Sequence, residues 1–408
     1  MLDDYGLTDE WCSILLLSFS HAFEQESYKV HKEYDEDKRL TGRYQKSAER
    51  EDADIKAKKE YELANKYLSE NNYRETAEWC RKAAEHGYVE AQYCLGALYR
   101  RGCGVEQNYK VAVEWYRRAA EQGHVNAQYS MFQMYFDGYG VEQDSKIAVE
   151  WCQKAAEQGV AGAQADLGTM YREGIVVEQN YKMAVEWYRK AAAQRNSWGQ
   201  DGLGFMYEQG YGVEQNYQAA AEWYRKAAEQ GNVNAQANLG TLYRHGRGVE
   251  RNYQMAIEWY KKAIKQGDTL AEVFLGSMYE QGNGVERNYQ VAAEWYRKAA
   301  EQGNTLAQKC LGSMYEQGNG VERNYQVAVE WYRKAAEQGY IDAQRLLGHM
   351  YENGYGVKQN YEMAVKWYQK AVENGDEEAQ NSLRLLTEKN KKKHISFSEK
   401  IKNWISEI

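Results

Sequence analysis

Nine tryptophans recur along the chain at a fixed spacing of 36 residues, with no insertion between them. They are Trp79, Trp115, Trp151, Trp187, Trp223, Trp259, Trp295, Trp331 and Trp367. A constant period of this length is the signature of a solenoid, in which each unit packs only on its neighbours. The period therefore outweighs the length of 408 residues, which alone would suggest two or three globular domains.

Each period contains two helical patterns. The phrase VAVEWYRKAAEQG at 327–339 places apolar residues at i, i+3, i+4 and i+7, which predicts one face of a helix. Those residues are Ala328, Trp331, Tyr332 and Ala335. Asn324 precedes the phrase as a candidate N-cap, and Gly339 follows it as a left-handed residue that ends the helix.

The first helix of the unit is predicted at about 307–316, within AQKCLGSMYEQGNGV. Gly312 lies in its middle, where glycine costs about 1 kcal/mol relative to alanine. The same phase holds glycine at 96, 168, 204, 240, 276 and 348, whereas Phe132 and Arg384 are exceptions. The repeated glycine predicts a close approach of the partner helix, with an aromatic ring over the missing side chain.

The fold class that follows is all-α: an α/α superhelical solenoid of 36-residue helix-turn-helix repeats, right-handed, with a concave and a convex face. Because there is no proline, glycine, asparagine and aspartate must make every turn. The tryptophans lie on the apolar stripe of every unit, so they are predicted to be core residues rather than a ligand platform.

The repeated pattern AQ-x-x-LG-x-x-Y-x-x-G-x-GV-x-x-NY-x-x-A-x-x-WY-x-KAA-x-x-G resembles the Sel-one-like repeat, a relative of the tetratricopeptide repeat, over about 73–386. The resemblance implies an adaptor or scaffold for protein complexes. Members of that family act in signalling, in membrane-associated degradation complexes and at bacterial host–microbe or cell–cell interfaces.

One secreted bacterial branch of that family staples each helix pair with a disulfide and has been linked to β-lactam binding. Its cysteines would fall at positions such as Gln308 and Ala336, so those staples are absent. The six cysteines contain no C-x-x-C pair, which disfavours a zinc site. They are interpreted as small buried thiols.

No sequence motif predicts a catalytic, cofactor-binding or metal-binding residue. The chain has no H-E-x-x-H, G-x-S-x-G or P-loop, and GNGVER follows a helix rather than a strand. A net charge of −8 argues against a dedicated nucleic-acid binder. The first residues lack a basic start and a long apolar run, so we expect a soluble, cytoplasmic protein without a transmembrane span.

Three segments are expected. Residues 1–60 form a helical, charged extension, 61–389 form the solenoid, and 390–408 form an amphipathic helix that caps the last unit. The alternative for residues 395–408 is weak docking to a membrane or a partner.

Function is expected where the units differ, because the shared positions are occupied by packing. The candidate partner-binding residues occupy the variable positions of the first helices and, by analogy with related superhelices, the concave side. They are Tyr93, Arg100, Arg101, Phe136, Arg172, Phe205, Arg244, Glu280, Glu316, His349 and Glu352. Early repeats contribute arginines and late repeats glutamates, with Glu208 an exception between them. This predicts a groove that is basic towards its N-terminal end and acidic towards its C-terminal end.

The leading functional hypothesis is a non-enzymatic protein–protein interaction scaffold that holds a partner polypeptide in this groove. The alternatives are a small-molecule-binding or hydrolytic repeat protein like the cysteine-rich branch, and a bacterial toxin-neutralising or effector protein. An extended mixed-charge groove would favour the first, and a deep pocket with convergent polar groups would favour an enzyme or small-molecule binder.

Overall fold

The structure is a computed structural model that describes residues 51–388. Within this range every regular element is a helix, which confirms the all-α prediction. The first helices of the hairpins are α3 (Val89–Arg101), α5 (Val125–Asp137), α7 (Ala161–Glu173), α9 (Ser197–Gln209), α11 (Val233–His245), α13 (Thr269–Gln281), α15 (Thr305–Gln317) and α17 (Ile341–Asn353). The second helices are α2 (Tyr73–Glu85), α4 (Tyr109–Glu121), α6 (Ser145–Glu157), α8 (Tyr181–Ala193), α10 (Tyr217–Glu229), α12 (Tyr253–Lys265), α14 (Tyr289–Glu301), α16 (Tyr325–Glu337) and α18 (Tyr361–Glu373). Helical residues 51–69 and 377–388 flank this series.

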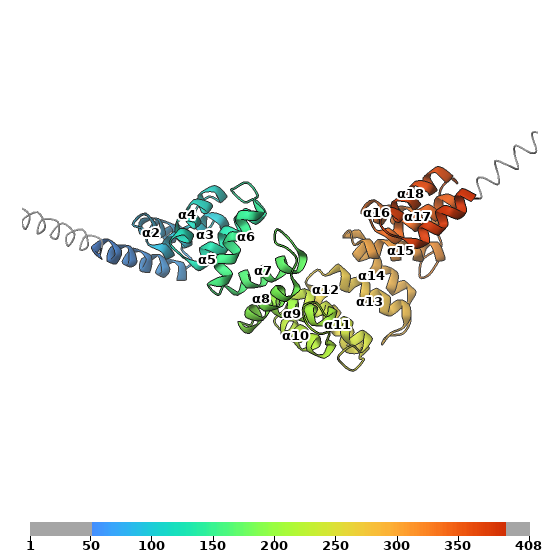
Figure 1. Cartoon of the computed structure of the whole chain (residues 1–408), viewed down its shortest axis with the longest axis horizontal. Helices are drawn as coiled ribbons and strands as arrows, with labels where there is room; N and C mark the ends of the chain where they lie inside the picture. The colour runs from blue at the N-terminus through green and yellow to red at the C-terminus, as the bar shows by residue number, and fades with distance from the viewer. Residues whose placement is uncertain (1–50, 389–408) are drawn as a thin grey trace, which may run out of the picture. The chain divides into compact units, whose positions relative to one another are not determined.

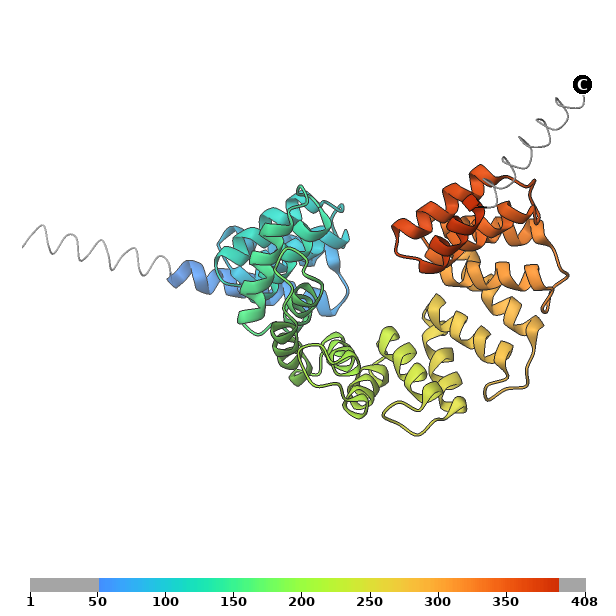
Figure 2. The same ribbon diagram turned by 45° about the vertical axis from the view of Figure 1, so that its right-hand side comes forward.

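The chain divides into two compact units, Met1–Ala163 and Gln164–Ile408. Within each unit, consecutive helices lie side by side as antiparallel hairpins (Figure 1). In the second unit, the hairpins from α8 to α18 follow one another in chain order (Figure 2). Each helix there packs mainly on the helices just before and after it, which is the nearest-neighbour packing that a solenoid requires.

The helix ends follow the expected local chemistry. Asn324 caps α16, because its side-chain oxygen accepts a hydrogen bond from the Val327 backbone N–H at 3.1 Å. Gly318 ends α15 in the left-handed conformation with a φ of 77°, and Gly339 follows α16 with a φ of 89°. The predicted N-cap and the predicted terminal glycine are therefore both confirmed.

The mid-helix glycines admit a tyrosine ring from the second helix. A Cβ placed on Gly204 would lie 2.5 Å from the ring of Tyr224, which is closer than real Cβ contacts allow. Where Phe132 replaces the glycine, the second helix carries Cys152 in the tyrosine phase, so the ring has moved from one helix to the other. The predicted close approach is confirmed, and the ring over each of these glycines belongs to the tyrosine that follows a repeat tryptophan.

The nine repeat tryptophans are not all as deeply buried as the sequence predicts. Trp187, Trp259 and Trp367 are buried, but the six others are only half-buried. Each indole ring is covered by the cation three residues later; Lys226 Nζ, for example, lies 4.0 Å from the Trp223 ring centroid. Those six still pack against the hydrophobic clusters, so the prediction of core tryptophans holds for them only at the edge of the core. The fully buried position of the stripe belongs to the tyrosine. Tyr224 is 0% exposed.

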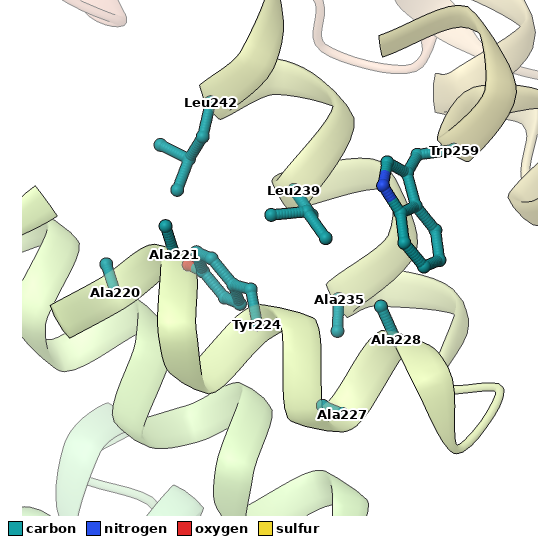
Figure 3. Close-up of a cluster of buried hydrophobic side chains, with 9 residues drawn as sticks. All are labelled: Ala220, Ala221, Tyr224, Ala227, Ala228, Ala235, Leu239, Leu242 and Trp259. Carbon is teal, nitrogen blue, oxygen red and sulfur yellow. The ribbon is translucent and has the colours of Figure 1, made fainter. Parts of the chain in front are cut away.

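Neighbouring hairpins share one hydrophobic core. In Figure 3, Trp259 lies beside Leu239 and Ala228, which come from the two preceding helices. Tyr224 of α10 lies in the same cluster with Leu242 of α11. A single hairpin cannot bury these faces alone, which explains why the phrase is repeated.

A ladder of side-chain amides adds a polar contact between neighbouring helices. Gln338 Nε2 donates to Gln308 Oε1 at 3.0 Å, and Gln308 Nε2 donates to the Ala300 carbonyl oxygen at 3.2 Å. The buried Gln308 is thus hydrogen-bonded on both sides, as a buried polar group must be. Glu272 replaces the glutamine in one hairpin and pairs with Lys298 at 2.6 Å.

The inter-helix loops contact the preceding hairpin through their second glycine. A Cβ on Gly212 would lie 2.5 Å from the Tyr181 carbonyl oxygen, so a side chain has no room there. Val176 occupies the equivalent loop position with a φ of 65°, which is a strained conformation for a β-branched residue.

No helix among residues 51–388 is both long and apolar enough to span a membrane. The predicted capping helix at 390–408, the docking segment 395–408 and most of the 1–60 extension lie outside the described residues. The segment boundaries at 60 and 389 stay predictions.

Candidate functional site

Most of the candidate partner-binding residues share one register of the first helices, that of Arg100 and Glu316, and the others lie beside it on the same helices. Arginines of this register contact the neighbouring first helix. Arg100 Nη1 donates to Gln133 Oε1 at 2.8 Å. Arg244 Nη2 donates to Ser277 Oγ at 2.9 Å. Each acceptor lies 33 residues further on, in the next first helix. We call this register, with the candidate residues on it, the first-helix row.

Arg172 follows the same pattern by a different contact. Its guanidinium carbon lies 4.9 Å from the ring centroid of Phe205, again in the next first helix. Arg172 also pairs with the neighbouring Glu173 at 2.7 Å. Three arginines of the row are therefore half-buried and held in place, rather than projecting freely into solvent.

The glutamates of the row face inward, towards the buried tyrosines. The hydroxyl groups of Tyr296 and Tyr332 each donate to a carboxylate oxygen, of Glu280 and Glu316 respectively, at 2.6 Å. Tyr368 donates to Glu352 at 3.0 Å, and Tyr224 donates to Glu208 at 2.8 Å. The acidic positions thus share one geometry in four hairpins.

Arginine and glutamate hairpins satisfy the tyrosine in different ways. Where the row carries Arg172 or Arg244, the tyrosine hydroxyl lies 3.0–3.1 Å from a threonine, Thr169 or Thr241. In the glutamate hairpins, burial and then the adjacent carboxylate raise the pKa of Tyr224 and Tyr332. These tyrosines stay protonated and act as hydrogen-bond donors throughout the physiological range.

Asp201 is a half-buried acid beside the row, in α9. Burial raises its pKa to about 7, while a hydrogen bond from Asn238 Nδ2, at 3.5 Å, and the charge of Arg172 act in the opposite direction. Glu208 adds repulsion that raises the pKa further. This side of the molecule therefore includes one carboxyl group that titrates near neutral pH.

The remaining candidate residues differ in exposure. Arg101, Phe136 and His349 are exposed. Tyr93 is half-buried and stacks on the His124 ring with centroids 4.5 Å apart. Within the second unit, the charged members from Arg172 to Glu352 lie along successive first helices.

Sequence reasoning missed one feature of this site, the tyrosine–glutamate hydrogen bond, whose signal is the constant 16-residue separation between the two residues. Away from the site, it also missed an irregular turn at Arg195, where the repeat phase elsewhere holds glycine. No group of three or more potential metal ligands occurs in the part of the chain that the structure describes.

Helix hairpins that repeat without interruption and share their cores define an α-helical solenoid. The family model for the Sel1 repeat matches most of the length of the chain, and the chain belongs to the Sel1 repeat family. The matched residues are 60–88, 89–124, 125–160, 161–196, 199–232, 233–268, 269–304, 306–340 and 341–376. The resemblance inferred from the sequence is confirmed.

Solved structures support the same assignment. The chain is similar to c5321, a protective antigen of uropathogenic Escherichia coli strains with an SLR fold, at 43% identity and a TM-score of 0.58. The match covers 75% of this chain and 66% of that one, which is just under two thirds of its length. No curated protein sequence matches the chain.

A Sel1 repeat protein from Oxalobacter formigenes is also similar, at 33% identity and a TM-score of 0.55, over 76% of this chain and 89% of that one. The immunity protein Pa5087 from Pseudomonas aeruginosa matches at 26% identity with a TM-score of 0.35, over 52% of this chain and 78% of that one. The last similarity is too low to carry a functional argument.

Proposed function

We propose that the chain is a non-enzymatic interaction protein that binds a partner polypeptide along the first-helix row. Membership of the Sel1 repeat family supports a scaffold role. The observation that carries the proposal is the contrast within each hairpin: core positions repeat, whereas the partly exposed row alternates among arginine, glutamate and aromatic residues.

The internal contacts of the row suit it to binding. A free charged side chain loses rotamer entropy when a partner immobilises it, at about 0.5–1.5 kcal/mol each. Arg244 and Glu316 are already held by hydrogen bonds, so less entropy remains to be lost. Both residues are only half-buried and keep part of their polar surface for a partner.

Paired charge reversals in the second unit test this proposal. Partners are first isolated with the full chain and identified by mass spectrometry. Binding to a purified partner is then compared for Arg172→Glu with Arg244→Glu, and for Glu316→Lys with Glu352→Lys. At least one pair should weaken binding tenfold or more, and wild-type binding should fall as salt rises.

Tyr332→Phe is the matched control for the glutamate pair. It removes the hydrogen bond to Glu316 but keeps the charge, so it should leave partner affinity within about threefold of wild type. If both double variants stay helical and bind like wild type at low salt, the first-helix row is not the binding site. The exposed loop tyrosines Tyr139, Tyr211 and Tyr355 would then be the next residues to test.

A further inference from the structure

A pocket of about 490 Å³ lies at the turn between α8 and α9, against the C-terminal half of α10. Its lining includes Arg195, Gln200, Trp223, Lys226, Glu229 and Gln230. The volume falls within the range of about 300–1,000 Å³ that is usual for ligand sites. The pocket shares no residue with the first-helix row.

Arg195 makes this turn unlike the others. It has a φ of 61°, in the left-handed region that favours glycine. The same phase of the repeat holds glycine in the other turns, at 87, 123, 159, 231, 267, 303, 339 and 375. A non-glycine residue is strained in this conformation, and such strain clusters at functional sites.

Gln200 differs from its counterparts in other hairpins. It is only 4% exposed, and its Oε1 accepts a hydrogen bond from Gln230 Nε2 at 2.6 Å. Its counterparts Gln236 and Gln308 also donate from Nε2 to an alanine carbonyl of the preceding helix. Within residues 51–388, Gln200 makes no such bond, so its Nε2 on the pocket lining can donate to a ligand.

The positively charged hydrogen-bond donors of the pocket favour an anionic ligand. Arg195 and Lys226 supply two positive charges, and Glu229 is the one acid among the lining residues, so the lining carries a net charge of +1. In the described part of the chain, Arg195 has no ion-pair partner, and the ammonium group of Lys226 lies over the Trp223 ring. The planar fork of arginine matches the two oxygens of a carboxylate.

We propose that this pocket binds a carboxylate group of a polypeptide ligand, with Arg195 and Lys226 as the charged donors. Gln200 supplies the neutral donor that the carboxylate satisfies. The Trp223 ring forms the apolar wall for the atoms that carry the carboxylate. This site goes beyond the first-helix row and provides a second, chemically specific contact with a bound chain.

The test uses the full chain and short N-acetylated alanine tripeptides. One carries a free C-terminal carboxylate, one is amidated, and one is amidated with glutamate in the middle. Binding is followed by the indole N–H signal of Trp223, which Trp223→Phe identifies. We expect a Kd of the order of 1 mM for the free acid and no saturation by the plain amide. Binding of the glutamate peptide would assign the carboxylate to a side chain, and binding of the free acid alone to a chain end.

Arg195→Gly is the decisive variant, because it restores the residue of the other turns. It should weaken binding of the free acid at least tenfold while the melting temperature stays equal or rises. Lys226→Met should also weaken binding. Lys262→Met is the matched control, because Lys262 occupies the same phase one hairpin later, where the turn holds Gly231.

Equal affinity of Arg195→Gly and wild type would overturn the proposal. So would equal binding of the free acid and the plain amide, or no binding of either carboxylate peptide at about 10 mM. None of these outcomes touches the first-helix row, since its residues are unchanged in all of these variants. The two proposals can therefore fail separately.

Discussion

Each tyrosine that follows a repeat tryptophan combines three tasks at the scale of a single residue. Tyr224 fills the space left by Gly204, closes a core shared with the next hairpin, and donates a hydrogen bond to Glu208. Trp223 is half-buried and lies under Lys226. The packing energy of the repeat is therefore concentrated on the tyrosine.

We expect Tyr224→Ala to destabilise the protein by about 3–5 kcal/mol, as a truncation of a fully buried aromatic side chain does. Trp223→Ala should cost less, about 2 kcal/mol, because part of the indole ring is already in contact with water. Urea denaturation of both variants measures the difference. An equal loss, or a larger loss for Trp223→Ala, would contradict this assignment.

The helix period predicted which face of each helix is apolar. It could not predict whether the tryptophan or the tyrosine beside it is the more deeply buried residue. Trp331 and Tyr332 occupy adjacent positions on one apolar stripe, at i+3 and i+4 from Ala328. Which of the two points at the partner helix depends on how the hairpin crosses, and this is a tertiary property. The mid-helix glycine was the stronger signal, because its cost required a close neighbour.

Asp201 should make stability fall as pH rises. Its folded-state pKa is about 7, whereas the unfolded value is about 3.9. Between these values the folded state holds a proton that the unfolded state has lost, so the free energy of unfolding decreases from about pH 4 to pH 7. Asp201→Asn should remove this dependence and stabilise the protein by about 2 kcal/mol at pH 8, because the amide carries no charge to bury.

Chemical denaturation at pH 5 and pH 8 measures this effect. The Glu→Gln exchange at Glu222, an exposed acid on α10, is the control and should change neither value. If Asp201→Asn keeps the wild-type difference between the two pH values, the carboxyl group is ionised in the folded protein at neutral pH.

At the scale of elements, two thiols meet where the second helix of one hairpin, α2, packs on the first helix of the next, α3. Cys80 on α2 and Cys94 on α3 have their Sγ atoms 3.0 Å apart, and Cys80 is buried. Donation by the Cys80 thiol lowers the pKa of Cys94, which makes Cys94 the better nucleophile. The family's cysteine-rich branch would place its staple elsewhere, at Ala84 and Gln92, so the sequence comparison did not indicate this pair.

We expect oxidised glutathione to join α2 to α3 through a Cys80–Cys94 disulfide. The Cys94 thiolate attacks the glutathione disulfide and releases one glutathione thiolate. The Cys80 sulfur, as it loses its proton, then displaces the second glutathione, so both electrons end on glutathione. Mass spectrometry of proteolytic peptides should show the cross-link and a loss of two hydrogens, and the melting temperature should rise.

Cys80→Ser is the matched variant. It should leave Cys94 as a mixed disulfide with glutathione and abolish the rise in melting temperature. Recovery of Cys80 and Cys94 as separate, unlinked thiols after oxidation of the wild-type protein would show that the helices do not let the two sulfur atoms bond.

At the scale of the whole molecule, the period fixed the number and kind of elements, while the division into two units was not foreseen. The second unit begins at Gln164, inside α7, although the 36-residue spacing continues through it unchanged. Spacing reports the length of each repeat and carries no measure of how strongly neighbours pack. Near this boundary, Val176 replaces a loop glycine of the repeat and Ser145 replaces the tyrosine that begins the second helices. The sequence shows these replacements but not their effect on packing.

Near-identical hairpins make one repeat dispensable. Residues 277–303 and 313–339 differ at very few positions, so deleting 277–312 joins Gly276 to Ser313 within the first-helix pattern. The new hairpin keeps the Tyr332–Glu316 hydrogen bond, and Lys334 takes the place of Lys298 beside Glu272. Because stability is a sum over repeats and their interfaces, the shortened chain should fold with unchanged helicity per residue and a modestly lower melting temperature.

Circular dichroism and thermal melting of the deletion variant measure this outcome. The control deletes half a period, 277–294, which joins Gly276 to Trp295 and breaks the alternation of first and second helices. That chain lacks a continuous repeat, so it should lose more helicity per residue and melt at a lower temperature than the chain without 277–312. Global unfolding of the chain without 277–312, or equal melting of the two shortened chains, would contradict nearest-neighbour stability.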